Sequence, residues 1–156
     1  MIPPLDQRGL LPPGKHLASW SEVFAYFSGD ARRCFLVDNA RNFALNDLAP
    51  KFSAGPLYLA GSTFSDKPYP NDIEVTMPLG IHQISPISMV DAVNFRINHD
   101  AIKARYEVDF YLYLEIEGSP DFSEFFQYVG DKTAAIKHLQ SKDKRGIIEV
   151  SQWIHG

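Results

Sequence analysis

Residues 57 to 75 read Leu57-Tyr58-Leu59-Ala60-Gly61-Ser62-Thr63-Phe64-Ser65-Asp66-Lys67-Pro68-Tyr69-Pro70-Asn71-Asp72-Ile73-Glu74-Val75. The apolar run at the start of this stretch predicts a strand that leads directly into Gly61-Ser62. A glycine lets the backbone approach an anion closely, and the neighbouring hydroxyl can donate a hydrogen bond to it. The first half of the stretch therefore predicts a strand followed by an anion-binding turn.

The second half of the stretch predicts another strand, with two acids on one face. Side chains of a strand point alternately to opposite faces, so Asp72 and Glu74 lie together while Ile73 and Val75 point the other way. Neighbouring carboxylates repel each other unless a cation lies between them, and hard divalent cations prefer oxygen ligands. The pattern indicates a site for Mg²⁺ or Mn²⁺.

A third acid follows in a later strand. Residues 106–114 alternate between apolar and polar positions, which predicts a strand with Val108 and Phe110 on its buried face and Asp109 on the opposite face. If this strand pairs beside the one that carries Asp72 and Glu74, Asp109 completes a cluster of three carboxylates. Such a cluster has enough oxygen ligands for two metal ions.

These residues resemble the signature of the nucleotidyltransferase superfamily that includes DNA polymerase beta. That signature is a hydrophobic strand, Gly-Ser, a spacer of roughly ten residues, an acidic-hydrophobic-acidic triplet and a third acid on a later strand. The chain matches it at Gly61, Ser62, Asp72, Glu74 and Asp109, although the family usually has aspartate where this chain has Glu74. The resemblance implies an α+β fold with a small mixed sheet and flanking helices.

A second resemblance covers most of the length. The chain is similar to a group of short bacterial and phage proteins known only as a domain of unknown function. The similarity lies in Leu11-Pro12-Pro13-Gly14-Lys15-His16, Arg32-Arg33, Asp66-Lys67-Pro68 and Gly146-Ile147-Ile148.

The superfamily resemblance implies a metal-dependent transfer of a nucleoside monophosphate from a nucleoside triphosphate to a hydroxyl acceptor. Asp72, Glu74 and Asp109 are then the catalytic residues and the metal ligands, with Asp109 as the general base. Gly61 and Ser62 bind the phosphates, and Lys67 is a secondary candidate for the same role. The expected cofactor is Mg²⁺ or Mn²⁺.

The chain also resembles small transferases of toxin–antitoxin and phage-defence systems, and this resemblance implies a host protein or RNA as the acceptor, ahead of a small molecule. The alternative from another class is a catalytically inactive protein that keeps this fold and binds a nucleotide or a partner. A hairpin with exposed charges is the simplest structural explanation of the Gly61 to Glu74 stretch, and Asp109 on a later strand makes it less favoured.

Length and composition predict one domain over residues 1–156, with a proline-rich N-terminal extension at 1–15, and the resemblance implies that this domain is a nucleotidyltransferase-like catalytic domain. With 156 residues, 45% of them hydrophobic, the chain can bury one sizeable core. The N-terminal residues carry no apolar stretch long enough for a signal peptide or a membrane span, and Cys34 is the sole cysteine. We therefore expect a cytoplasmic protein that does not associate with membranes.

A formal net charge of −4 argues against general binding to nucleic acids. The densest basic stretch, residues 142–145, contains an acid and reads as a solvated loop, so we assign it no function.

The five histidines lack metal-ligand spacing, so a zinc site is not expected. Arg32 and Arg33 either bind phosphate or an acceptor in a cleft, or form ion pairs with Asp30 or Asp38.

Caps and periodicity predict the remaining elements. Ser19 begins a helix that Gly29 ends, and Asp30 caps a second helix that stops near Pro50. The other expected elements are strands at 57–60, 72–78 and 106–114, a helix at 86–105 with a kink near Asn98, two helices marked by residues 122–129 and 135–139, and a short last strand at 146–150.

Overall fold

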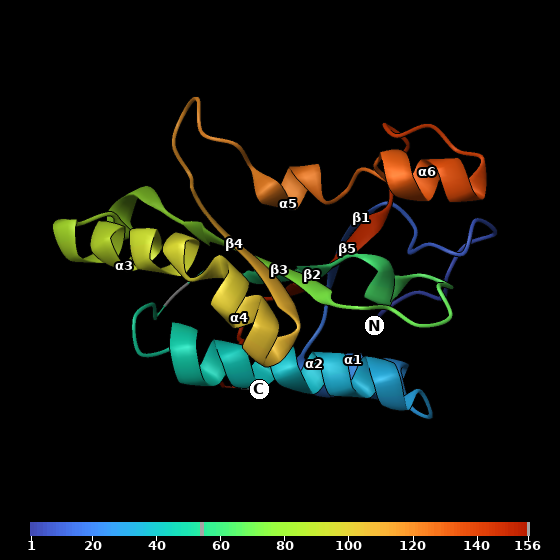
Figure 1. Cartoon of the computed structure of the whole chain (residues 1–156), viewed down its shortest axis with the longest axis horizontal. Coiled ribbons are helices and arrows are strands. Elements are labelled where there is room, and N and C mark those ends of the chain that lie inside the picture. Colours follow the sequence, from blue (N-terminus) through green and yellow to red (C-terminus); the bar gives the residue numbers. More distant parts are fainter. Residues whose placement is uncertain (54, 156) are drawn as a thin grey trace.

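A computed structural model describes residues 1–53 and 55–155. They form a five-stranded mixed sheet in the order β1-β5-β2-β3-β4. The strands are β1 (Gly14–Leu17), β2 (Leu57–Ala60), β3 (Ile73–Leu79), β4 (Val108–Leu114) and β5 (Gly146–Val150). Helices α1 and α2 lie along one side of the sheet, and α5 and α6 lie over the other (Figure 1). The predicted α+β class, mixed sheet and flanking helices are confirmed.

The first two helices begin where the sequence places their caps. Ser19 and Glu22 form the capping box of α1 (Trp20–Tyr26), and the Asp30 side chain accepts a hydrogen bond at the start of α2 (Ala31–Phe43). A π-helical turn extends α2 through residues 44–48. The expected kink at Asn98 separates α3 (Pro86–Ile97) from α4 (His99–Tyr106), and the last helices are α5 (Phe122–Phe125) and α6 (Asp131–Lys137).

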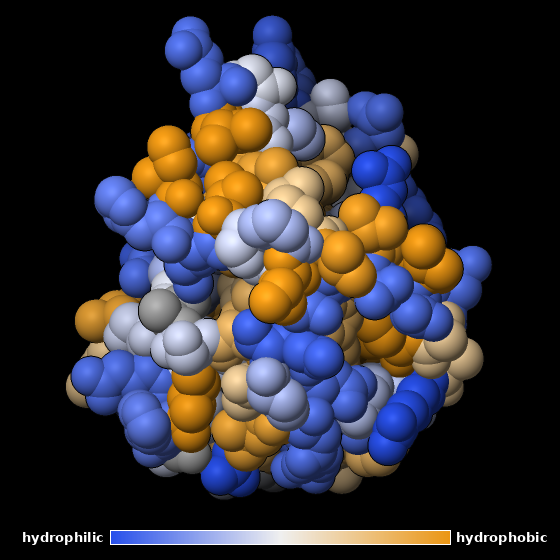
Figure 2. All heavy atoms as spheres, turned by 90° about the vertical axis from the view of Figure 1, so that its left-hand side faces the viewer, coloured by the Kyte–Doolittle hydropathy of each residue, from blue (hydrophilic) through white to orange (hydrophobic). Residues whose placement is uncertain are grey.

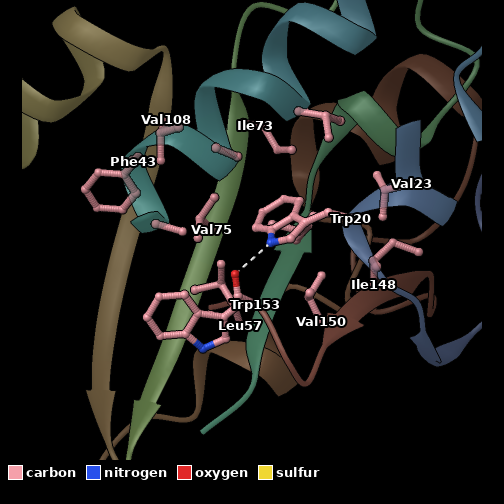
Figure 3. Close-up of a cluster of buried hydrophobic side chains, with 14 of the residues drawn as sticks. Trp20, Val23, Phe43, Leu57, Ile73, Val75, Val108, Ile148, Val150 and Trp153 are labelled. Atoms are coloured by element: carbon pink, nitrogen blue, oxygen red, sulfur yellow. Dashed lines mark hydrogen bonds between the residues drawn. The ribbon is translucent and has the colours of Figure 1, made fainter. Parts of the chain in front are cut away.

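The main core fills the space between the sheet and α1, α2 and α4. Leu57, Val75 and Val108 point into it from three neighbouring strands, and Figure 3 shows Trp20 and Trp153 beside them. The Trp20 indole donates a hydrogen bond of 3.0 Å to the Trp153 carbonyl, so the buried N–H has a partner. This packing leaves the opposite face of the sheet to carry the polar residues.

The N-terminal segment contributes more to the fold than the proline-rich composition indicated. Leu10 and Leu11 are fully buried, and Gly14–Leu17 forms the edge strand β1, parallel to β5. Sequence analysis did not predict β1 because a four-residue edge strand with two polar positions shows too little alternation. Residues 10–17 are therefore integrated into the sheet and the core.

Arg33 fixes the first half of the loop between β2 and β3. Its guanidinium is buried and donates hydrogen bonds to the carbonyls of Thr63 (2.7 Å), Ser65 (2.7 Å) and Lys67 (2.6 Å). It also pairs with Asp30 at 2.7 Å. One side chain therefore satisfies three loop carbonyls that no sheet ladder reaches.

Arg32 fixes the second half of the same loop. It donates hydrogen bonds to the carbonyls of Pro70 (2.8 Å) and Asn71 (2.7 Å), and it pairs with Glu107 at 2.8 Å. Of the partners that the sequence indicated for these arginines, Arg33 does pair with Asp30, whereas Arg32 pairs with Glu107, which the sequence did not indicate. Both arginines also position this loop.

Helix α3 leaves an apolar stripe at the surface. Ile87, Val90, Val93 and Ile97 recur at helical spacing and are each more than half exposed. Figure 2 faces this side of the molecule and shows hydrophobic side chains among hydrophilic ones. No helix within the described residues combines the length and apolar character needed to cross a membrane.

We predict that Arg33→Met lowers the free energy of unfolding by about 3 kcal/mol, because it leaves three carbonyls and the Asp30 carboxylate without their buried donor. Urea unfolding followed by circular dichroism measures the change. Arg96→Met is the matched control on an exposed position of α3 and should change stability little. Equal stability of wild type and Arg33→Met would contradict the structural role given to Arg33.

Candidate functional site

The pairing of three strands aligns the candidate site. Ala60 of β2 lies opposite Glu74 of β3, and Glu74 lies opposite Asp109 of β4. Residues paired in this way present their side chains on the same face of the sheet. The structure thus places Glu74 and Asp109 side by side, as the sequence predicted, and the small Ala60 leaves space beside them.

Two basic side chains from α4 contact the acids. The Lys103 ammonium lies 3.1 Å from an Asp72 carboxylate oxygen and 3.5 Å from one of Asp109, so it bridges the two. The His99 ring nitrogen lies 2.5 Å from the other oxygen of Asp109. The hydrogen bond with Asp72 is the main cause that raises the pKa of Lys103.

Glu74 is the most buried of the three acids. Burial raises its pKa from 4.5 to about 7, and repulsion from Asp72 adds to the effect. Its Oε2 atom is buried and has no hydrogen-bond partner among the described residues. An orphaned carboxylate oxygen of this kind is costly unless the group is protonated or a ligand binds it.

Gly61 makes room for Glu74. Its φ of +93° is a conformation that side chains other than glycine rarely adopt, and a Cβ there would collide with the Glu74 carboxylate. The glycine is therefore required by the acid beneath it as well as by any anion that approaches. The Ser62 hydroxyl makes no hydrogen bond within the described part of the chain, so it is free for a ligand.

Arg145 is a site residue that sequence analysis missed. It precedes β5 and lies beside the end of β2, where its buried guanidinium donates a hydrogen bond to the Gly61 carbonyl. Burial lowers its pKa, and the nearby Glu74 opposes that shift. The interpretation of residues 142–145 as a solvated loop was thus wrong for Arg145, which is buried.

A cleft of about 1080 Å³ opens between the β2–β3 loop and the α5–α6 segment. Its lining includes five of the predicted site residues: Gly61, Ser62, Lys67, Asp72 and Glu74. Asp109 is not in that lining, but it is linked to it through Lys103 and Asp72. Most of the predicted residues thus share one cleft.

Comparison with known proteins gives one match. A model of a family of unknown function, DUF6932, matches residues 3–151. The chain belongs to the DUF6932 family. Neither the curated proteins nor the solved structures contain a match to it. The resemblance to a domain of unknown function agrees with this membership, whereas nothing in the comparisons ties DUF6932 to nucleotidyltransferases.

In this DUF6932 protein the acids have the donor type of a Mg²⁺ site, and two features fit a cation. One is the buried Glu74 oxygen, which lacks a partner among the described residues, and the other is the Lys103 ammonium that bridges Asp72 and Asp109. Within residues 1–53 and 55–155, however, no three His, Cys, Asp or Glu side chains converge with metal-ligand geometry. Lys103 itself supplies a positive charge to Asp72 and Asp109.

His99, Lys103 and Arg145 were not predicted as site residues because none belongs to the motif. Lys103 and His99 lie four residues apart on α4, so helical periodicity places them on one face, and α4 leads directly into the strand of Asp109. That proximity in sequence was the available signal. For Arg145 the signal in the sequence was weaker: the residue stands immediately before the buried Gly146-Ile147-Ile148.

We predict that Glu74→Gln stabilises the metal-free protein at pH 8. The folded carboxyl binds its proton more tightly than the unfolded one, so the free energy of unfolding falls as pH rises from 4.5 to about 7. Above this pH window the buried charge of Glu74 lowers the free energy of unfolding by on the order of 3 kcal/mol. Glutamine carries no charge, so the variant avoids this loss.

Melting temperatures in a chelator at pH 8 and pH 4 measure the effect. The variant should have a higher melting temperature than wild type at pH 8. The difference should vanish at pH 4, where Glu74 is protonated in both the folded and the unfolded protein. The exposed Glu117→Gln is the control. A lower melting temperature of Glu74→Gln at pH 8 would instead mean that Glu74 and Arg145 form a stabilising ion pair.

Proposed function

We propose that this protein transfers a nucleoside monophosphate from a nucleoside triphosphate to a hydroxyl group of a protein or RNA. The observation that carries the proposal is the alignment of Glu74 and Asp109 on neighbouring strands, with Asp72 in the lining of a cleft that Gly61 and Ser62 also line. This is the arrangement that the resemblance to the nucleotidyltransferase fold implies.

In this proposal the residues of the cleft have different roles in binding the triphosphate. The Ser62 hydroxyl and the Lys67 ammonium bind phosphate oxygens, since both line the cleft and neither has a partner among the described residues. Arg145 holds the Gly61 carbonyl and so fixes the turn that presents Ser62. Positioning of the triphosphate in this way lowers the entropic cost of the reaction.

Mg²⁺ or Mn²⁺ held by Asp72, Glu74 and Asp109 would supply positive charge beside the reacting phosphate. Asp109 takes the proton from the acceptor hydroxyl, and His99, in contact with its other oxygen, orients the carboxylate. The acceptor oxygen bonds to the α-phosphorus, the bond from that phosphorus to the bridging oxygen breaks, and pyrophosphate leaves with the electron pair. Lys103 must release Asp72 and Asp109 for them to bind a metal.

The test is label transfer from each of four nucleoside triphosphates labelled at the α-phosphate. The protein, Mg²⁺ and a bacterial lysate are incubated together, and the macromolecules are then separated. Label in one protein or RNA species, together with pyrophosphate release, is the expected result. The resemblance to small transferases of such systems favours a conflict between phage and host, or a toxin–antitoxin pair, as the setting.

We predict that Asp72→Asn and Asp109→Asn each fold normally and reduce label transfer by at least a thousandfold, because each removes charge stabilisation at the reacting phosphorus. Asp38→Asn, an exposed change on α2, is the control and should keep full activity. Wild-type activity in either site variant would rule out the mechanism.

We predict that Ser62→Ala weakens triphosphate binding by about 1.5 to 3 kcal/mol, the value of a hydrogen bond to a charged group. Gly61→Val should be more severe, because its side chain displaces Glu74 as well as obstructing the phosphate. Calorimetric titration and circular dichroism separate lost binding from lost folding. If Ser62→Ala binds like wild type and Gly61→Val only unfolds, the turn is purely structural.

The second candidate is a protein that binds nucleotides or a partner without turnover. Lys103 and His99 already compensate Asp72 and Asp109, and the apolar stripe of α3 offers a surface for a partner. Under this proposal a triphosphate with Mg²⁺ raises the melting temperature, but no pyrophosphate is released in any extract.

A further inference from the structure

Aromatic side chains line the cleft on the side opposite the Gly61 turn. Phe125 is 64% exposed and Tyr128 is 42% exposed, and both belong to the cleft lining. Exposed aromatic rings in a cleft form a flat apolar surface that water solvates poorly. Nothing in the mechanism proposed above uses this side of the cleft.

Helix α5 holds Phe125 rigidly. Phe122 stacks on Tyr111 of β4, with ring centroids 5.0 Å apart, and Phe126 lies 5.6 Å from the same ring. Phe125 makes edge contacts with both phenylalanines. Two aromatic residues thus bind α5 to the sheet, and the third remains exposed at a fixed place.

Tyr128 is held in a different way. It forms a bridge with Lys144, whose ammonium lies 3.8 Å from the centre of the tyrosine ring. This cation–π contact holds the tyrosine ring in the cleft that Phe125 also lines. The aromatic surface therefore exists before any ligand binds.

The cleft also concentrates positive charge that has no partner. Five of its described lining residues are Lys or Arg and four are Asp or Glu, although the whole chain carries a net charge of −4. Among the residues that the structure describes, the ammonium groups of Lys67, Lys132 and Lys142 make no ion pair or hydrogen bond. Unpaired lysines around one cleft attract a polyanion.

We propose that this cleft is a nucleotide site with two kinds of contact: Phe125 and Tyr128 stack on the base, and Lys67, Lys132 and Lys142 bind the phosphates. This proposal rests on the proposed function, and it names the side chains that would recognise the nucleoside triphosphate. Every base has a π-face, so stacking alone distinguishes bases weakly. The site takes nucleoside triphosphates as a class and discriminates little between them.

The test compares two ligands that differ only in the nucleoside. Dissociation constants of ATP and of inorganic tripolyphosphate are measured by calorimetry with Mg²⁺ and no acceptor. Phe125→Ala should weaken ATP about tenfold or more and leave tripolyphosphate unchanged, whereas Phe125→Trp should retain ATP binding. Lys142→Gln should weaken both ligands alike. The control Phe35→Ala removes an exposed phenylalanine from α2, on the other side of the sheet.

The outcomes separate this proposal from the proposed function. Equal effects of Phe125→Ala on the two ligands, or none on either, overturn the stacking site even if the wild type transfers label. A loss confined to ATP, in a wild type that never transfers label, supports the stacking site and rejects the transferase. Failure of the wild type to bind either ligand overturns both. Circular dichroism of each variant excludes unfolding as the cause.

Discussion

Carboxylates that are fixed side by side on a sheet need positive charge nearby, and this requirement organises the site. The parallel pairing of β3 with β4 leaves Glu74 and Asp109 no freedom to separate. Around them the chain supplies Lys103 against Asp72 and Asp109, and Arg145 near Glu74. Because these cations come from α4 and from the residue before β5, the site is complete only when α4 and β5 have joined β2, β3 and β4.

The second requirement concerns the loop between β2 and β3. Its backbone carbonyl groups need hydrogen-bond donors although the loop is not part of the sheet. The segment between β2 and β3 forms one wall of the cleft, and its backbone pairs with the rest of the chain only through an isolated bridge between Ser65 and Leu10 among the described residues. Arg32 and Arg33 resolve this, since their guanidinium groups bind five loop carbonyls between them. The fork geometry of arginine makes this arrangement inaccessible to lysine. The start of α2 therefore sets the shape of the cleft.

The sequence predicted features that depend on neighbouring residues. The caps of α1 and α2, the kink at Asn98 and the faces of the strands followed from local patterns, and the motif indicated that Asp109 should join Glu74. Features made by distant residues were missed. The bond from Arg145 to Gly61 joins positions 84 residues apart, and β1 exists only because β5 offers it an edge. The assignment of activity to these acids stays a prediction.

The glutamate at position 74 has a structural explanation that concerns Gly61. The extra methylene of glutamate, compared with aspartate, carries the carboxylate under the turn to the place that a Cβ of residue 61 would occupy. Glycine at 61 and glutamate at 74 therefore form a steric pair. The same placement buries the carboxylate and raises its pKa, while Arg145 lies close enough to oppose that shift and to hold the turn closed over it. A longer acid thus requires a buried arginine and a glycine beside it, and these three residues belong to three different strands or their ends.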